Sequence, residues 1–152
     1  MIKVVMLVIL LVFNAERRLV NMPNNNDKLL DSIWQVESSK GTNPKRLEPN
    51  EAGALGDYQL KPGAVQDVRR VYPSKYADKS FEEIALDPIT SREAANDYLS
   101  IIQMHLRNKN IAPTLEALST GYHSGMGNVA RGTIGPKGLN YWTRIQALME
   151  EE

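Results

Sequence analysis

The stretch Leu29-Leu30-Asp31-Ser32-Ile33-Trp34-Gln35-Val36-Glu37-Ser38-Ser39 decides how this chain folds. At the spacing of an α-helix, Leu30, Ile33, Trp34 and Glu37 share one face, and three of these four residues are apolar. We therefore expect the face to pack against a core, with the Glu37 carboxylate where the apolar stripe ends. Partial desolvation raises the pKa of a carboxylate, which suits a general acid near neutral pH. The alternative is a solvated residue at a frayed helix end, since Glu is rarely buried.

Composition places the chain among ordinary globular domains. It has 152 residues, 42% of them hydrophobic and 24% charged, which fits one domain with its own core. Its 18 basic and 18 acidic residues cancel, so no global field favours nucleic acid, and we expect none as a partner. With no cysteine and two histidines, the chain is expected to hold no disulfide, no metal and no cofactor.

The first residues match a secretory signal peptide. Lys3 precedes an apolar run over residues 4–13, which is too short for a stable membrane anchor, and Ala15 suits the last position before cleavage. We expect a signal peptide over residues 1–15, a linker over 16–26 and an exported domain, periplasmic or secreted, over 27–152. The alternatives are an uncleaved signal anchor and an N-terminal helix of the domain itself.

Helix start and stop signals predict a mainly helical domain. Asp27 is expected to cap the first helix, Ser80 and Glu83 form a capping-box pattern, and Asp87-Pro88 opens the longest helix. The predicted helices cover about residues 28–38, 62–72, 81–86, 88–108, 114–124 and 139–149. Residues expected to face inward in the longest helix are Ile89, Ala94, Ala95, Tyr98, Leu99, Ile102 and Leu106. Residues 41–60 lose this periodicity and would hold any short strands, and glycine-rich loops are expected over 125–138.

Four short motifs follow one another on these elements. They are Glu37-Ser38-Ser39, then Gly56-Asp57-Tyr58-Gln59-Leu60, then Ala94-Ala95-Asn96-Asp97-Tyr98-Leu99, and finally Ala117-Leu118-Ser119-Thr120-Gly121-Tyr122-His123-Ser124-Gly125-Met126-Gly127-Asn128-Val129. In this order they resemble the lytic transglycosylase domain of the soluble-lytic-transglycosylase, goose-lysozyme-like type, over about residues 27–149. The resemblance implies a mainly α (α+β lysozyme-like) fold: a single compact helical domain with a short irregular or β segment lining the cleft.

The resemblance also implies a reaction. Proteins of this family cleave the β-1,4 bond between N-acetylmuramic acid and N-acetylglucosamine in peptidoglycan glycan strands, and Glu37 matches their sole catalytic acid and base. Glu37 would protonate the glycosidic oxygen and then either deprotonate the muramoyl 6-hydroxyl, giving a 1,6-anhydro product, or activate water. The second course is that of a hydrolytic lysozyme. The domain is expected to act as a monomer.

Six residues are expected to contact the substrate: Ser38, Tyr58, Gln59, Tyr122, His123 and Gly125. Ser38 has an alternative role as a helix C-terminal cap, and the Tyr122 hydroxyl is expected to point toward the catalytic carboxylate. His123 stands where the family usually has Asn, which alters a sugar contact and introduces a titrating group. Tyr141 and Trp142 could also stack on sugars, although the spacing of Trp142 with Ile145 is typical of a core.

Loop carboxylates and altered motifs leave other interpretations open. Glu48, Glu51 and Asp57 fall in the segment expected to form the cleft wall. They are either solvated or face Glu37 across the sugar, which would permit inverting hydrolysis. From a different class, the chain could be a catalytically impaired cell-wall-binding or assembly module. It could also be a component of phage or envelope-spanning machinery that opens a local gap in the wall.

Overall fold

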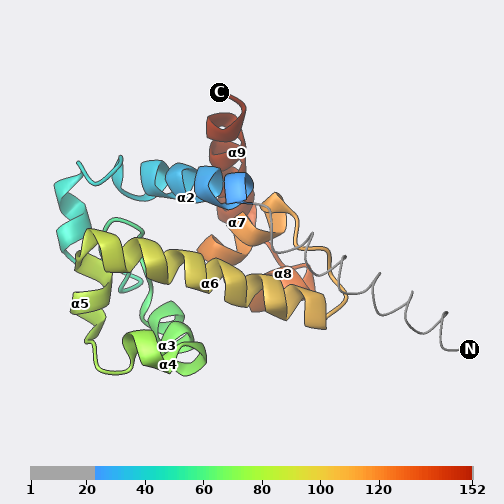
Figure 1. Ribbon diagram of the computed structural model, residues 1–152. Helices are drawn as coiled ribbons and strands as arrows, with labels where there is room; N and C mark the ends of the chain where they lie inside the picture. Colours follow the sequence, from blue (N-terminus) through green and yellow to red (C-terminus); the bar gives the residue numbers. More distant parts are fainter. Residues whose placement is uncertain (1–22, 152) are drawn as a thin grey trace, which may run out of the picture.

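Helix α6 (Pro88–Asn108) runs through the middle of the molecule, and most of the other helices contact it (Figure 1). The structure is a computed structural model that describes residues 23–151, with only the backbone described for residues 23–25. Pro88 occupies the first turn of α6, and the Asp87 side chain accepts a hydrogen bond from the Thr90 amide at 2.7 Å. The predicted start and end of this helix are therefore confirmed. The expected inward face is buried except for Ile89, which is 75% exposed. At about 3.6 residues per turn Ile89 lies on the opposite side of the helix from Tyr98, whereas Ser91 in the same first turn is fully buried.

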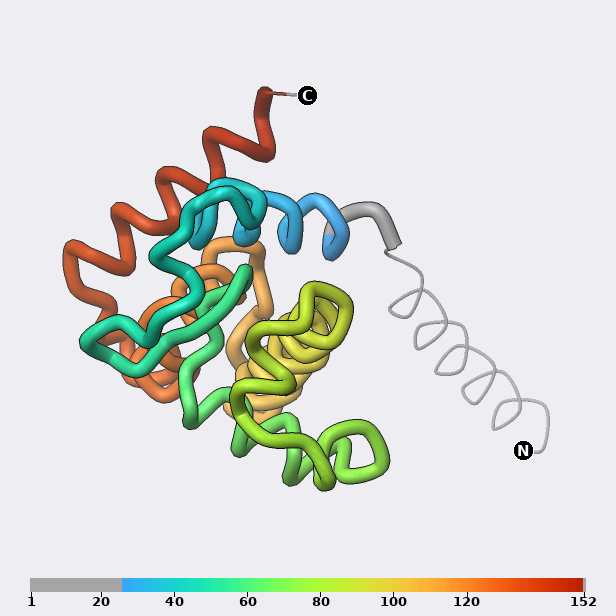
Figure 2. The backbone as a smooth tube through the Cα atoms, turned by 90° about the vertical axis from the view of Figure 1, so that its left-hand side faces the viewer, coloured from blue at the N-terminus to red at the C-terminus, as the bar shows by residue number. Residues whose placement is uncertain are grey.

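Helices α2 (Pro23–Ser38) and α9 (Pro136–Glu150) pack against each other. Helix α2 begins at Pro23, so the prediction that Asp27 caps it was wrong. Asp27 lies within the helix, where its carboxylate is 3.4 Å from the Arg92 guanidinium. The expected linker over residues 16–26 thus ends in helix, while the expected signal peptide lies outside the described residues. Helix α9 begins at Pro136, earlier than predicted, and its C-terminal end projects beyond the other helices in Figures 1 and 2.

Three shorter helices lie on one side of α6. These are α3 (Pro62–Val71), α4 (Pro73–Tyr76) and α5 (Phe81–Leu86), and α3 and α5 both contact α6. The predicted capping box at α5 is confirmed, because Ser80 Oγ accepts from the Glu83 amide and the Glu83 carboxylate accepts from the Ser80 amide. Helix α4 was not predicted, since proline was taken only as the stop of the preceding helix.

The glycine-rich region contains a helix that sequence analysis had assigned to loops. Helix α7 (Leu115–Ser124) was predicted over about residues 114–124; Thr114 caps its start and Gly125 its end. Gly125 has a φ of +92°, which favours glycine, and it separates α7 from α8 (Met126–Arg131). Glycines on both sides of α8 hid its short helical pattern.

The irregular segment between α2 and α3 is the remaining feature of the fold. It contains the short 3-10 helix η1 (Pro44–Leu47) and one isolated antiparallel bridge between Leu55 and Leu60. The mainly α fold with a short irregular segment is therefore confirmed. Gly56 closes the turn with a φ of +83°, and a Cβ there would lie 1.7 Å from the Ala85 carbonyl oxygen. Within residues 23–151, no helix is long and apolar enough to cross a membrane.

Candidate active site

A cavity of about 450 Å³ opens where the end of α2, the irregular segment and the α7 and α9 helices meet. Most of the lining residues come from the irregular segment, while α7 contributes Tyr122 and His123 and α9 contributes Lys137. The residues that line it are Glu37, Asn50, Glu51, Ala52, Ala54, Gln59, Lys61, Tyr122, His123 and Lys137. Four of the predicted site residues, Glu37, Gln59, Tyr122 and His123, are thus brought together although they are distant in sequence.

Glu37 lies on the cavity wall at the last turn of α2. The apolar residues of its helical face are packed in the core, Leu30 and Ile33 fully and Trp34 in part. Burial raises the pKa of Glu37 to about 7, against the opposing influence of Tyr141, Lys61 and Arg144. A carboxyl group with this pKa can both donate and accept a proton near neutral pH, which is the requirement for a general acid and base.

Tyr141 is a site residue whose position next to Glu37 sequence analysis missed. Its hydroxyl is buried and has no hydrogen-bond partner among the described residues, yet as a donor beside Glu37 it lowers the pKa of that carboxyl. The two groups thus face each other without a completed hydrogen bond. The sequence indicated for Tyr141 either core packing or stacking on a sugar, because a local pattern cannot show which distant side chain a hydroxyl meets.

Gln59 lines the cavity with its side-chain amide held on both sides. Its Nε2 donates to the Gly56 carbonyl at 2.9 Å, and its Oε1 accepts from Asn50 Nδ2 at 3.3 Å. Asn50 is in turn fixed because its Oδ1 accepts from the amides of Ala52 and Ala54. Two amide side chains therefore stand on the same wall, each with capacity left for a polar ligand.

Tyr122 lines the cavity, but its hydroxyl does not hydrogen-bond to Glu37. The hydroxyl donates to the Tyr58 carbonyl oxygen at 2.8 Å, and the ring packs edge-on against Tyr98 with centroids 5.7 Å apart. Burial and, after it, the charge of the neighbouring Glu37 raise the pKa of Tyr122. In this structure Tyr122 shapes the cavity floor and anchors the irregular segment, whereas the hydroxyl beside Glu37 belongs to Tyr141.

Three other expected contacts lie away from the cavity lining. Tyr58 is 2% exposed, and its hydroxyl accepts from Arg92 at 2.9 Å, so its ring cannot stack on a sugar in this structure. Ser38 is buried as a C-terminal cap: its Oγ donates to the Trp34 carbonyl and accepts from the Gly41 amide. Gly125 forms the turn between α7 and α8 and does not line the cavity.

His123 faces the cavity and stacks on the Tyr141 ring, with centroids 4.6 Å apart. Its Nδ1 lies 3.2 Å from Ser124 Oγ. Burial, then the charges of Lys61 and Lys137, lower the pKa of His123 from its ordinary value of 6.5. A neutral imidazole therefore stands beside the tyrosine that neighbours Glu37, available to donate or accept a hydrogen bond.

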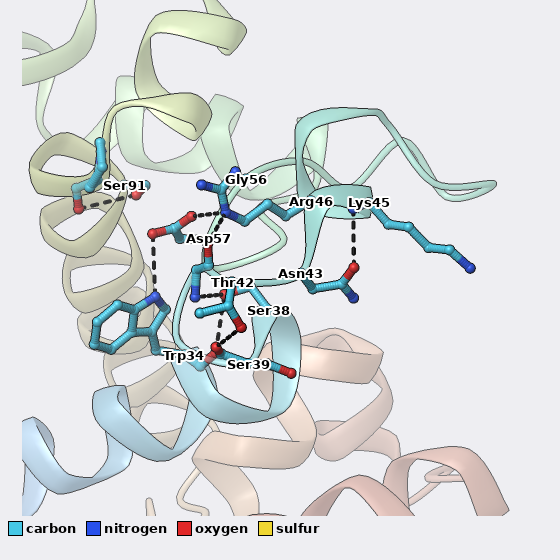
Figure 3. A network of polar contacts seen from close by, with 12 residues as sticks. Trp34, Ser38, Ser39, Thr42, Asn43, Lys45, Arg46, Gly56, Asp57 and Ser91 are labelled. Carbon is cyan, nitrogen blue, oxygen red and sulfur yellow. Dashed lines mark hydrogen bonds and ion pairs between the residues drawn. The ribbon is translucent and has the colours of Figure 1, made fainter.

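The three loop carboxylates take different positions. Asp57 is turned away from the cavity, because it pairs with Arg46 Nε at 2.9 Å and accepts from Trp34 Nε1 at 3.3 Å (Figure 3). Arg46 also donates to the Gly41 carbonyl at 2.7 Å, so this cluster holds the irregular segment against the end of α2. Glu48 is exposed and outside the lining, whereas Glu51 is exposed and lines the cavity with Glu37.

The described residues contain no cluster of side chains that could bind a metal ion. No group of three or more His, Asp or Glu side chains there is arranged to hold a metal ion. The polar groups of the cavity are instead amides, an imidazole, a tyrosine, two lysines, the exposed Glu51 carboxylate and the Glu37 carboxyl group with its raised pKa. These groups suit the recognition of a polar organic ligand and proton transfer to it.

A helical domain with a partly buried carboxyl group on the wall of a polar cavity defines a lysozyme-like class of protein. The chain belongs to the Transglycosylase SLT domain family, whose model matches residues 15–145. At the level of the family, this membership indicates a lytic transglycosylase-like function and a peptidoglycan substrate. No curated protein and no solved structure is significantly similar to the chain.

Proposed function

We propose that this protein cleaves the β-1,4 bond between N-acetylmuramic acid and N-acetylglucosamine by lytic transglycosylation. The observation that carries the proposal is Glu37, whose pKa burial raises to about 7 on the wall of a cavity in the family's domain. The amides of Gln59 and Asn50 on the same wall are suited to hold the N-acetyl groups of the sugars.

Glu37 serves as acid and then as base. Its protonated carboxyl gives the proton to the glycosidic oxygen as the bond to C1 of muramic acid breaks, and N-acetylglucosamine leaves with a free 4-hydroxyl. Positive charge at C1 is stabilised by the substrate's own N-acetyl group, which replaces the second carboxylate of other glycosidases. The Glu37 carboxylate then takes the proton of the muramoyl 6-hydroxyl while O6 bonds to C1. The product is a 1,6-anhydro sugar, the proton returns to Glu37, and no water is consumed.

The placement of two of the three loop carboxylates argues against their acting in inverting hydrolysis. Asp57 is engaged by Arg46 and Trp34, and Glu48 lies outside the cavity lining. Glu51 alone of the three lines the cavity, and it is exposed. An inverting enzyme needs a second carboxylate to activate water on the opposite face of the sugar, so Glu51 is the residue to exchange when hydrolysis is tested.

Mass analysis of digested peptidoglycan tests the proposed reaction. We expect the wild-type protein and Glu51→Gln to release the same anhydromuramoyl fragments, each lighter by one water than a reducing-end fragment. Reducing-end fragments that vanish in Glu51→Gln would assign hydrolysis instead. Absence of any fragment from a folded wild-type protein would assign the chain to the binding or assembly modules.

We also propose that the domain works as an exported monomer, because its substrate lies outside the cytoplasmic membrane and the first residues match a signal peptide. N-terminal mapping of protein from an extracytoplasmic fraction tests export. Recovery of only the intact chain in the cytoplasm would contradict it.

A further inference from the structure

Two lysines on the cavity wall have no part in the proposed proton transfers. Lys61 immediately precedes α3 and Lys137 is the second residue of α9, and both line the same cavity as Glu37. Both residues are exposed. Within residues 23–151, neither of them forms an ion pair with a carboxylate. Their charges are therefore available to a ligand in the cavity.

The two lysines act on the same part of the cavity. Lys61 Nζ donates a hydrogen bond to the His123 carbonyl at 2.5 Å, which fixes its ammonium group beside that residue. Lys61 and Lys137 both lower the pKa of His123, and Lys61 also lowers the pKa of Glu37. Because each lysine stands at the start of a helix, the partial positive charge of the helix N-terminus adds to its own. The two lysines thus supply positive charge next to Glu37, in a cavity that the exposed Glu51 carboxylate also lines.

A neutral sugar has no anionic group that could pair with these lysines, whereas muramic acid carries a carboxyl group. Its lactyl group is attached to O3 of the sugar whose C1 bond Glu37 is proposed to break. The lactyl carboxyl is either free or extended by a stem peptide that carries carboxylates of its own. An anionic group therefore accompanies the reacting sugar into the cavity, and a lysine ammonium group is a suitable point charge for a carboxylate.

We propose that Lys61 and Lys137 form a carboxylate-binding subsite for the anionic group attached to muramic acid. The subsite selects peptidoglycan strands over neutral polymers of N-acetylglucosamine, and this inference rests on the proposed function. The carboxylate is supplied either by the free lactyl group of peptide-free strands or by the stem peptide.

The test measures binding in the Glu37→Gln background, where no turnover is expected to consume the ligand. Calorimetry gives the Kd for soluble glycan strands stripped of peptide, for strands that carry stem peptides, and for chito-oligosaccharides of equal length. The first two ligands are measured again after conversion of their carboxylates to methylamides. The proteins are the parent, Lys137→Gln, Lys137→Arg, and the control Lys109→Gln, since Lys109 is exposed at the end of α6 and outside the cavity.

Lys137→Gln should weaken binding of strands with free carboxylates about two- to five-fold, as expected for a solvent-exposed ion pair. It should leave chito-oligosaccharides and methylamide strands unaffected, while Lys137→Arg and Lys109→Gln should bind like the parent. An effect on peptide-free strands identifies the lactyl carboxylate, and one confined to peptide-bearing strands identifies the stem peptide. The inference would be overturned if the parent protein bound the strands equally well before and after their carboxylates were converted to methylamides. It would also be overturned if Lys137→Gln weakened the binding of chito-oligosaccharides as much as that of the strands. Because binding is read without cleavage, failure of this subsite is distinct from failure of the proposed reaction.

Discussion

The burial of Glu37 predicts a pH dependence of folding stability that the substitution Glu37→Gln should remove. Below about pH 4.5 the group is protonated in both the folded and the unfolded chain, so it contributes nothing to pH dependence. Between pH 4.5 and about 7, the unfolded chain releases the proton while the folded protein keeps it. The wild-type protein therefore loses stability as pH rises through this window, and the loss is complete above pH 7.

The size of the effect follows from the difference between the two pKa values. A shift from 4.5 to about 7, at 1.36 kcal/mol for each pKa unit, corresponds to about 3 kcal/mol of unfolding free energy. Glutamine cannot ionise and avoids this loss. The stability of Glu37→Gln relative to wild type should therefore rise by about 3 kcal/mol between about pH 4 and about pH 8.5.

Urea unfolding followed by circular dichroism at these two pH values measures the difference directly, because the other titrating groups cancel between variant and wild type. Tyr122→Phe is the matched control. The pKa of Tyr122 lies well above its ordinary value of 10.0, so Tyr122 is protonated at both pH values and the stability difference between Tyr122→Phe and wild type should not change with pH. A relative stability of Glu37→Gln that does not change with pH, or that falls, would refute the reasoning.

Three further predictions concern stability. Gly56→Ala should destabilise the fold by more than about 4 kcal/mol, or prevent folding, because its Cβ would lie 1.7 Å from the Ala85 carbonyl oxygen; unfolding at wild-type denaturant concentration would contradict this. Asp57→Ala should lower stability by about 2 kcal/mol, because Trp34 Nε1 and the Arg46 guanidinium lose their acceptor. It should also reduce kcat/KM because the cavity wall loosens, and unchanged kinetics would show that the wall does not depend on Asp57. Tyr122→Phe should lower stability by about 1–3 kcal/mol because a buried carbonyl loses its donor, and equal stability by urea unfolding would argue against that bond.

Local signals were enough to predict most helices. Pro88 after the capping residue Asp87 placed the start of α6, and the Ser80–Glu83 capping box placed α5, because backbone N–H groups at helix starts are satisfied by nearby side chains. Helix α8 was missed since its surrounding glycines outweighed a six-residue pattern. Ile89 was wrongly placed inside because its apolar side chain was given more weight than its position, which is opposite Tyr98 on the helix.

The candidate site was predictable only where it depends on α2. The apolar stripe ending at Glu37 follows from helical geometry, and so does its partial burial. The roles of Tyr58 and Tyr141 depend on contacts between distant segments: Tyr58 turns its hydroxyl to Arg92, and Tyr141 brings its hydroxyl to Glu37. Both tyrosines have polar and apolar neighbours along the chain, so the sequence offered no signal that would separate a cavity position from a core one.

The most direct test of the central claim is the rate at which Glu37→Gln clears purified peptidoglycan. The amide keeps the size of the side chain but can neither give nor take the proton, and general acid–base catalysis contributes about 10²–10⁴-fold. We predict a loss at the upper end of that range or beyond, in a variant whose thermal unfolding shows that it is folded and whose sedimentation with peptidoglycan shows that it binds. A folded, binding variant that cleared peptidoglycan at the wild-type rate would contradict the assignment of Glu37 as the catalytic acid and base.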